Sequence, residues 1–171
     1  MLSSAAKEYL KVYGVLVGKN PLVFTNNDSG YETAIEFKKN GINPIILDSR
    51  VNPQSEIIDE AINLGIKIKF SYVVVAAHGY KKVSSADIAK ISNDKKQLGT
   101  IENIKCDCIC VSGFWTPTIH LASQSGNKTK FKEEIDAFVP GQSKQNEITL
   151  GAANGVFSVS YTHLTLPTSY A

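Results

Sequence analysis

The residues best suited to chemistry lie where a short buried run ends and a helical pattern begins. Residues 21–25 are largely apolar, and the polar residues after them lead into a helix-like periodicity. A helix N-terminus offers free backbone N–H groups and positive potential, which suit a phosphate group. The candidate phosphate-binding residues are therefore Thr25, Asn26, Asn27, Asp28, Ser29 and Gly30.

These six residues depart from the glycine-rich pattern G-x-G-x-x-G, in which each glycine lets backbone approach phosphate or a neighbouring element. Only the third glycine, Gly30, is present, and Asp28 adds a negative charge where phosphate would sit. Ser29 and Glu32 form an S-x-x-E capping box, so the serine would compete with phosphate for a backbone N–H. Two interpretations stay open: nucleotide binding at this turn, and a scaffold that has lost it.

Two further candidates follow the second predicted strand, residues 44–47. Asp48 stands where an acidic residue binds a ribose 2′-hydroxyl, and Arg50 could instead meet a 2′-phosphate. An acidic residue that only caps a turn is the alternative for Asp48.

The cysteines and histidines give weaker signals. Cys106, Cys108 and Cys110 alternate, so on a strand they would share one face, and we interpret them as core residues. Their spacing does not match a zinc site, and we expect no metal centre. His78 is predicted in an exposed hairpin turn. His120 lies in a loop and could act only within a larger assembly, because no nucleophile motif accompanies it.

The elements that must position these residues can be read from the periodicity. An N-terminal helix with Ala6, Tyr9, Leu10 and Tyr13 on its buried face ends at Gly14. The strand at 21–25, a helix from Ser29 to Gly41, the strand at 44–47, and a helix capped by Asn52 with Ile58, Ala61 and Ile62 buried then follow. Such a β-α-β-α order predicts parallel strands with right-handed crossovers.

The pattern changes after residue 65. Residues 66–70, 72–77, 80–83, 87–91 and 97–101 read as strands of an antiparallel excursion, with turns at 78–79 and 93–96. A strand at 106–111, a polar loop at 123–130, a weak helix or irregular segment at 131–138 and a short strand at 148–150 complete the chain. The predicted fold is α/β: a Rossmann-like three-layer nucleotide-binding domain with a parallel sheet and an antiparallel β excursion.

Composition excludes several classes of partner. The chain has 171 residues, 43% of them hydrophobic, and a net charge of +2 with scattered lysines, so we expect no nucleic acid as partner. No apolar run approaches the roughly 20 residues of a membrane span, and no signal peptide is visible. The expected location is the cytoplasm.

Two local patterns resemble the two-dinucleotide-domain flavoproteins of the disulfide-reductase type. Residues 107–117 resemble that superfamily's D-x-[IV]-x-x-[AS]-x-G-x-x-P segment, which adds Ser112 and Gly113 to the cofactor-binding candidates. Residues 151–155 resemble its G-D-x-x-G segment, with Ala152 in place of the aspartate. That substitution argues against assigning flavin contact to this segment through that residue.

A narrower resemblance is to the α subunits of heterotetrameric sarcosine oxidases. It rests on the phrases VFTNNDSGY at 23–31, VSGFWTPTIHLASQSGNK at 111–128, AFVPGQS at 137–143 and GAANG at 151–155. The family implies oxidation of sarcosine to glycine, with formaldehyde or methylene-tetrahydrofolate and hydrogen peroxide as the other products. It also implies NAD in the intact α subunit, FAD and FMN mainly elsewhere in the complex, tetrahydrofolate in another domain, and β, γ and δ subunits as partners.

This resemblance predicts four parts of the chain. Residues 1–20 are a helix and linker of a flanking domain, and 21–113 an inserted dinucleotide domain of NAD(P)/FAD type. Residues 114–158 return to a first, truncated dinucleotide domain. Residues 159–168, VSYTHLTLPT, resemble a translated transposon-end sequencing adapter, so 159–171 are interpreted as a non-native tail.

The chain is thus expected to be an internal fragment that supplies nucleotide-fold scaffold rather than the substrate site, inactive alone and without a catalytic residue. Two alternatives stay open. One is a fragment of an NAD(P)H-dependent flavoprotein oxidoreductase of the disulfide-reductase type, and the other a purely structural subunit-docking module.

Overall fold

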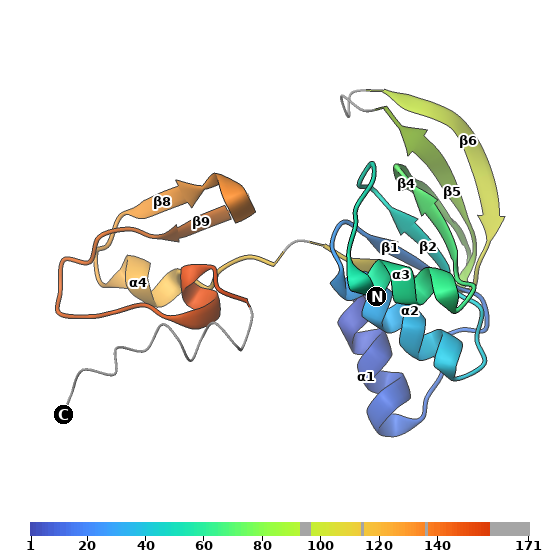
Figure 1. Cartoon of the computed structure of the whole chain (residues 1–171), viewed down its shortest axis with the longest axis horizontal. Coiled ribbons are helices and arrows are strands. Elements are labelled where there is room, and N and C mark those ends of the chain that lie inside the picture. The colour runs from blue at the N-terminus through green and yellow to red at the C-terminus, as the bar shows by residue number, and fades with distance from the viewer. Residues whose placement is uncertain (93–96, 114, 136, 158–171) are drawn as a thin grey trace. The chain divides into compact units, whose positions relative to one another are not determined.

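The computed structural model describes residues 1–92, 97–113, 115–135 and 137–157. The chain divides into two compact units, Met1–Phe114 and Trp115–Ala171, and each is described by itself (Figure 1). The predicted turn at 93–96 and the proposed foreign tail at 159–171 lie outside the described residues.

The first unit is built on a four-stranded parallel sheet. Its strand order is β3-β2-β1-β7, and the strands are β1 (Pro21–Thr25), β2 (Ile45–Asp48), β3 (Lys67–Phe70) and β7 (Cys108–Ser112). The register pairs Thr25 with Asp48 on one side and with Ser112 on the other. The last residues of three strands therefore lie side by side at the carboxyl edge of the sheet.

Two further layers cover this sheet, one on each face (Figure 1). The helices α1 (Ser3–Tyr13), α2 (Ser29–Lys39) and α3 (Glu56–Asn63) pack on one face, where Val23 and Ile46 are buried among their side chains. The antiparallel sheet of β4 (Tyr72–Gly79), β5 (Val83–Ile91) and β6 (Leu98–Lys105) packs on the other, against Leu22 and Leu47. Alternate residues of β1 thus pack against opposite layers. The predicted three-layer α/β fold is confirmed.

Helix α2 approaches β1 very closely at Gly30. A Cβ atom at this position would lie 2.5 Å from Cβ of Thr25, which is closer than real side chains pack. The third glycine of the turn is therefore needed for helix–strand packing, whatever the turn binds.

The structure corrects several helix details. Tyr9 and Tyr13 are 48% and 67% exposed, so the buried face of α1 consists of Ser3, Ala6 and Leu10, although Gly14 ends the helix as predicted. Helix α3 begins later than expected, after Ser55 rather than at the predicted Asn52 cap. Ile58 and Ala61 are buried there as predicted, but Ile62 is exposed.

Strand assignments also change. Residues 66–70 alternate as predicted, but β3 joins the parallel sheet instead of the antiparallel excursion. The predicted strands at 80–83 and 87–91 are wrong in extent, because the chain turns at 80–82 and β5 runs unbroken from Val83 to Ile91. Strand periodicity is the same in both kinds of sheet, so it could not decide which sheet each strand joins.

The second unit contains α4 (His120–Gln124), a β8–β9 hairpin of Thr129–Lys132 and Ala137–Pro140, and two short 3-10 helices, η1 (Glu133–Ile135) and η2 (Gly151–Asn154). Residues 131–138 were predicted as a weak helix or irregular segment, but those that the structure describes belong to β8, η1 and β9. The predicted strand at 148–150 is wrong, because these residues form no strand. The Glu147 carboxylate accepts hydrogen bonds from Ser125 and Asn127 and fixes the connection that follows β9. Every helix among the described residues is too short or too polar to cross a bilayer.

Replacing Gly30 by alanine tests the close contact between α2 and β1. We expect Gly30→Ala to lower the free energy of unfolding by about 1–3 kcal/mol, because the added methyl group must displace Thr25. Gly113→Ala is the matched control, since a Cβ there meets no atom within 4 Å, and it should change stability by less than about 0.5 kcal/mol. Urea unfolding followed by circular dichroism measures both, and equal stabilities would contradict the packing role.

Candidate nucleotide-type site at the carboxyl edge of the parallel sheet

The structure brings all ten predicted cofactor-binding residues to one edge of the parallel sheet. They come from the ends of β1, β2 and β7, the turn after β1 and the first turn of α2. The ten are Thr25, Asn26, Asn27, Asp28, Ser29, Gly30, Asp48, Arg50, Ser112 and Gly113. Ligands of open α/β sheets bind outside the carboxyl ends of the strands, so this edge is the candidate site.

Asn27 is the hub of the turn. Its Oδ1 accepts hydrogen bonds from the backbone N of Ser29 at 3.0 Å, from the Ser29 hydroxyl at 2.7 Å and from the Ser112 hydroxyl at 3.2 Å. Its Nδ2 donates to the carbonyl of Gly113, which ties the turn to the end of β7. The amide oxygen of Asn27 thus occupies the acceptor position at the start of α2, where a phosphate oxygen would bind.

The predicted capping box is wrong. Helix α2 begins at Ser29 with Asp28 as its N-cap, and the N-cap makes no side-chain hydrogen bond. The Ser29 hydroxyl lies 2.6 Å from that of Ser112, and Glu32 pairs with Lys7 instead of reaching back to the helix start. Thr25, the last residue of β1, stabilises the turn, because its hydroxyl donates to the carbonyl of Asn27 at 2.7 Å.

The carboxylate of Asp48 is fully buried, and both of its oxygens accept hydrogen bonds. The Tyr31 hydroxyl donates to its Oδ2 at 2.7 Å, and the backbone N of Arg50 donates to its Oδ1 at 2.9 Å. The Arg50 guanidinium adds contacts from Nε and Nη2, the latter 2.8 Å from Oδ2. Asp48 therefore acts as a structural anion here, and its oxygens already have internal donors where a ribose hydroxyl would need them.

Arg50 also reaches the turn. Its Nη2 lies 2.8 Å from Oδ1 of Asp28, so one guanidinium bridges two carboxylates. Burial disfavours the charged guanidinium, but the hydrogen bonds and charges of Asp48 and Asp28 outweigh it and raise the pKa of Arg50 above its usual value. The guanidinium is thus fixed in its charged form.

Tyr31 is the member of this site that sequence reasoning missed. The helical pattern places it on the apolar face of α2, and the ring is indeed completely buried. A buried phenol almost always finds a hydrogen-bond partner, so a tyrosine on a buried helix face was the available signal. Burial, together with the hydrogen bond to Asp48, raises the pKa of Tyr31 above its usual range.

The cysteines and histidines are not among the residues that form this edge. The three cysteines are buried and free, as predicted, but Cys106 lies in the opposite core layer from Cys108 and Cys110. His78 belongs to β4 rather than to a turn, and its Nε2 lies 2.7 Å from Asp87. His120 is exposed at the first residue of α4. No group of three or more metal-ligating side chains occurs among the described residues.

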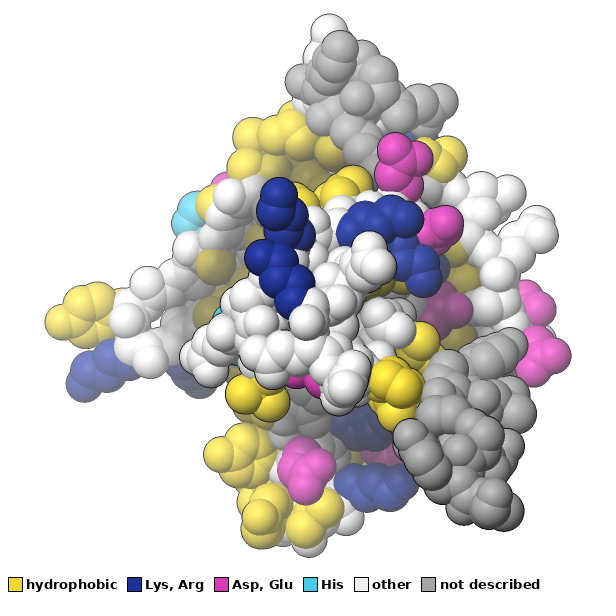
Figure 2. Space-filling model, turned by 90° about the vertical axis from the view of Figure 1, so that its left-hand side faces the viewer, with side chains coloured by type: hydrophobic (Ala, Val, Ile, Leu, Met, Phe, Trp, Pro, Cys, Tyr) yellow, Lys and Arg dark blue, Asp and Glu magenta, His cyan; other side chains and the backbone are white. Residues whose placement is uncertain are grey.

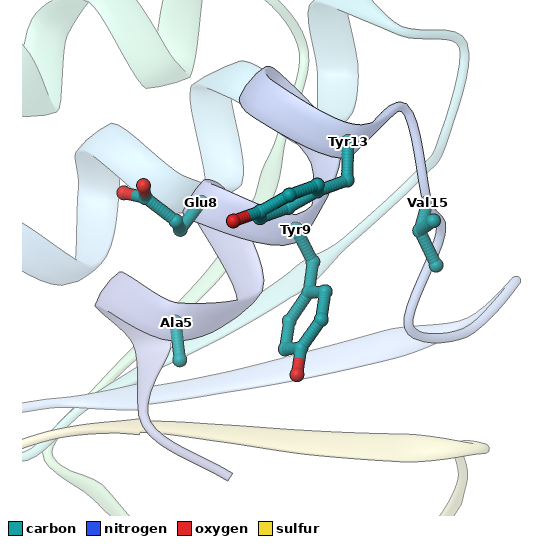
Figure 3. A pocket seen from close by; sticks show the side chains of 5 residues that line it. All are labelled: Ala5, Glu8, Tyr9, Tyr13 and Val15. Carbon is teal, nitrogen blue, oxygen red and sulfur yellow. The ribbon is translucent and has the colours of Figure 1, made fainter.

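A hollow of about 490 Å³ on α1 is lined by Ala5, Glu8, Tyr9, Tyr13 and Val15 (Figure 3). The two tyrosine rings stand side by side there, with centroids 6.1 Å apart. None of the predicted site residues lines it. On the face shown in Figure 2, lysine and arginine side chains lie in separate groups among polar and apolar ones.

Replacing Tyr31 by phenylalanine tests the buried network. We expect Tyr31→Phe to lower the free energy of unfolding by about 1–3 kcal/mol at pH 7, because one oxygen of a buried carboxylate loses one of its donors. Tyr80→Phe is the control, since Tyr80 is 97% exposed. Urea denaturation measures the free energy of unfolding of the wild-type chain and of the two variants.

The pH dependence of that difference has a definite sign. Tyr31 has a raised pKa in the folded chain, so the unfolded chain loses its phenol proton first, near pH 10. The wild-type advantage over Tyr31→Phe is therefore complete below about pH 10 and shrinks by about 1.4 kcal/mol per pH unit above it. A difference that stays constant between pH 7 and pH 11 would contradict the assignment.

Curated relatives match nearly the whole chain. It is 31% identical over 162 residues to the sarcosine oxidase subunit alpha of Corynebacterium sp. (strain P-1), which covers 94% of this chain and 16% of that protein. It is 32% identical over 161 residues to the subunit alpha of Rhizobium meliloti (strain 1021), which covers 90% of this chain and 14% of that protein. The chain therefore spans about one sixth of these relatives or less. No protein-family model matches it.

Solved structures share the fold at low sequence identity. Thioredoxin reductase of T. acidophilum matches with a TM-score of 0.60 and 15% identity, over 89% of this chain and 51% of that one. A HOCl-induced flavoprotein disulfide reductase from Escherichia coli matches with a TM-score of 0.61 and 14% identity, over 87% of this chain and 34% of that one. Over nearly all of its length, the chain is thus related in sequence to one segment of the sarcosine oxidase α subunit, and it has the Rossmann-like fold of these reductases.

Proposed function

We propose that this chain supplies a nucleotide-type scaffold to the α subunit of a sarcosine-oxidising flavoenzyme complex. In that complex sarcosine would become glycine, with formaldehyde or methylene-tetrahydrofolate and hydrogen peroxide as the other products. The observation that carries the proposal is the match to the α subunits at 31% identity over 94% of the chain. The partners would be the β, γ and δ subunits of the complex, and the compartment the cytoplasm.

The geometry of the turn supports a scaffold rather than a reacting site. The Asn27 amide oxygen takes the N–H and the hydroxyls that a phosphate would use, and Asp48 is saturated by Tyr31 and Arg50. As it stands, the turn does not fit a pyrophosphate, and no step is assigned to a nucleotide here. We propose that NAD belongs to other parts of the intact α subunit, that FAD and FMN lie mainly elsewhere in the complex, and that tetrahydrofolate binds another domain.

The four parts predicted from the sequence are kept as a proposal. In it, residues 21–113 form an inserted dinucleotide domain, 1–20 and 114–158 belong with a flanking domain, and 159–171 are foreign to the protein. Genomic sequence beyond codon 158 would test the last point, because codons unlike the adapter would contradict it.

One observation favours a second candidate, an NAD(P)H-dependent flavoprotein oxidoreductase. Gly30 is retained at the start of α2, and the third glycine of this turn allows the close helix–strand packing of nucleotide-binding domains of this fold. Titration of the chain with NADH separates the two candidates. Saturable binding would favour the oxidoreductase, and absence of binding at millimolar NADH favours the scaffold.

A segment exchange tests the proposed function directly. Residues 1–157 of this chain would replace the matching segment of the Corynebacterium sp. (strain P-1) α subunit, which is then co-expressed with its partner subunits. We expect the complex to assemble and to make hydrogen peroxide when sarcosine is added. The matched control carries the equivalent segment of T. acidophilum thioredoxin reductase, which has the fold without the sequence match, and should be inactive.

Two outcomes would contradict the proposal. An exchanged complex that assembles with its flavins but makes no peroxide would separate this chain from the family's function. Peroxide production from sarcosine by this chain alone would contradict its role as scaffold.

A further inference from the structure

Arg50 lies between two carboxylates of different character. Asp48 is completely buried and holds Nε and Nη2 of the guanidinium from the protein side. Asp28 meets the same Nη2 through its Oδ1, and its side chain is 45% exposed. Among the described residues, no group bonds to Nη1 of Arg50. The guanidinium is thus held through Nε and Nη2, while Nη1 has no partner among these residues.

This arrangement has the chemistry of a phosphate receptor. A guanidinium presents donors in a fixed plane that matches phosphate as well as carboxylate. The buried contacts to Asp48 set its orientation in advance, so an anion would not have to order the side chain. Arg50 also lies just after β2, where the 2′-phosphate of an adenine dinucleotide meets an arginine in this class of fold.

We propose that Asp28 is an internal anion that occupies Arg50 and makes this edge of the sheet reject a phosphate monoester, in particular a 2′-phosphate on adenosine. Asp28 is then a specificity-determining residue. The inference deepens the proposed function and rests on it only for the dinucleotide-type fold, not for sarcosine chemistry.

Charge balance explains the rejection. Asp28 and Asp48 together carry two negative charges against the single positive charge of Arg50, so the edge has a net negative charge. To engage both terminal nitrogens of the guanidinium, a phosphate monoester would have to displace the Asp28 carboxylate from Nη2 and then remain beside it. Its distance from Asp28 would be shorter than the Debye length of about 8–10 Å at physiological salt, so screening would not remove the repulsion.

The opposite reading is that the Asp28–Arg50 pair is an ordinary surface ion pair with no bearing on ligands. Such pairs are common and contribute little to stability. The two readings differ in what happens when only the Asp28 charge is removed. Under the proposal an anion site opens, whereas an ordinary ion pair leaves nothing behind.

The test measures binding of 2′,5′-ADP and 5′-AMP to the full chain by isothermal titration calorimetry. The two probes differ only in the 2′-phosphate. We expect Asp28→Asn to bind 2′,5′-ADP at least about tenfold more tightly than the wild-type chain, a change of about 1.4 kcal/mol, with no change for 5′-AMP. The Asp28 side chain makes no capping hydrogen bond to α2, so the helix should remain intact in Asp28→Asn, which circular dichroism verifies.

Glu32→Gln is the matched charge control. It makes the same change in net charge on the same helix, but Glu32 pairs with Lys7 and not with Arg50. We expect it to bind 2′,5′-ADP as the wild-type chain does. The double variant Asp28→Asn, Arg50→Lys keeps a cation beside Asp48 but removes the planar fork, and should lose the gain.

The proposal is overturned if Asp28→Asn binds 2′,5′-ADP no more tightly than Glu32→Gln, including the case in which neither binds at millimolar concentration. An equal gain for 5′-AMP would also overturn it, because the 2′-phosphate would then play no part. These outcomes are independent of the segment exchange, which reports on sarcosine oxidation and not on nucleotide anions.

Discussion

The buried carboxylate of Asp48 sets the geometry of the whole carboxyl edge. A charge removed from water is costly unless it is paired and hydrogen-bonded, and here the partners come from three directions. Tyr31 reaches it from α2, while the backbone and guanidinium of Arg50 fold back from the following loop. Meeting this one requirement fixes α2 over β2 and brings Arg50 to Asp28 in the turn.

Local sequence was sufficient for the elements that carry the site, and insufficient for how distant parts meet. The β1–α2–β2 unit was predictable because its apolar periodicity, its glycine and its short connections all act within a few residues. The sheet that residues 66–70 join was not, because an edge strand and an antiparallel strand show the same alternation. The β8–β9 hairpin was missed for a related reason: the short stretch at 131–138, in which apolar and charged residues are mixed, gives no periodicity that separates helix from strand.

The candidate site shows the same division. Its ten residues were identified from the turn, the strand ends and the resemblance, and the register of β1 with β2 and β7 brings them together. Their partners were not predictable, because Ser29 bonds to Ser112 rather than to its own helix, across 83 positions of the chain. The apparent capping box was a local pattern overridden by this tertiary contact.

Gly30 belongs to a nucleotide-binding motif, but the packing of α2 on β1 is enough to require it. Its lack of a side chain is demanded by Thr25 beneath it, so selection would keep the glycine even after a nucleotide had ceased to bind. A search that weights this glycine heavily would therefore retrieve the architecture and not the activity. The more informative positions are Asn27 and Asp28, whose amide and carboxylate hold the backbone N–H of Ser29 and the guanidinium of Arg50. A comparison of chains with this fold would therefore do better to follow these two positions than the glycine.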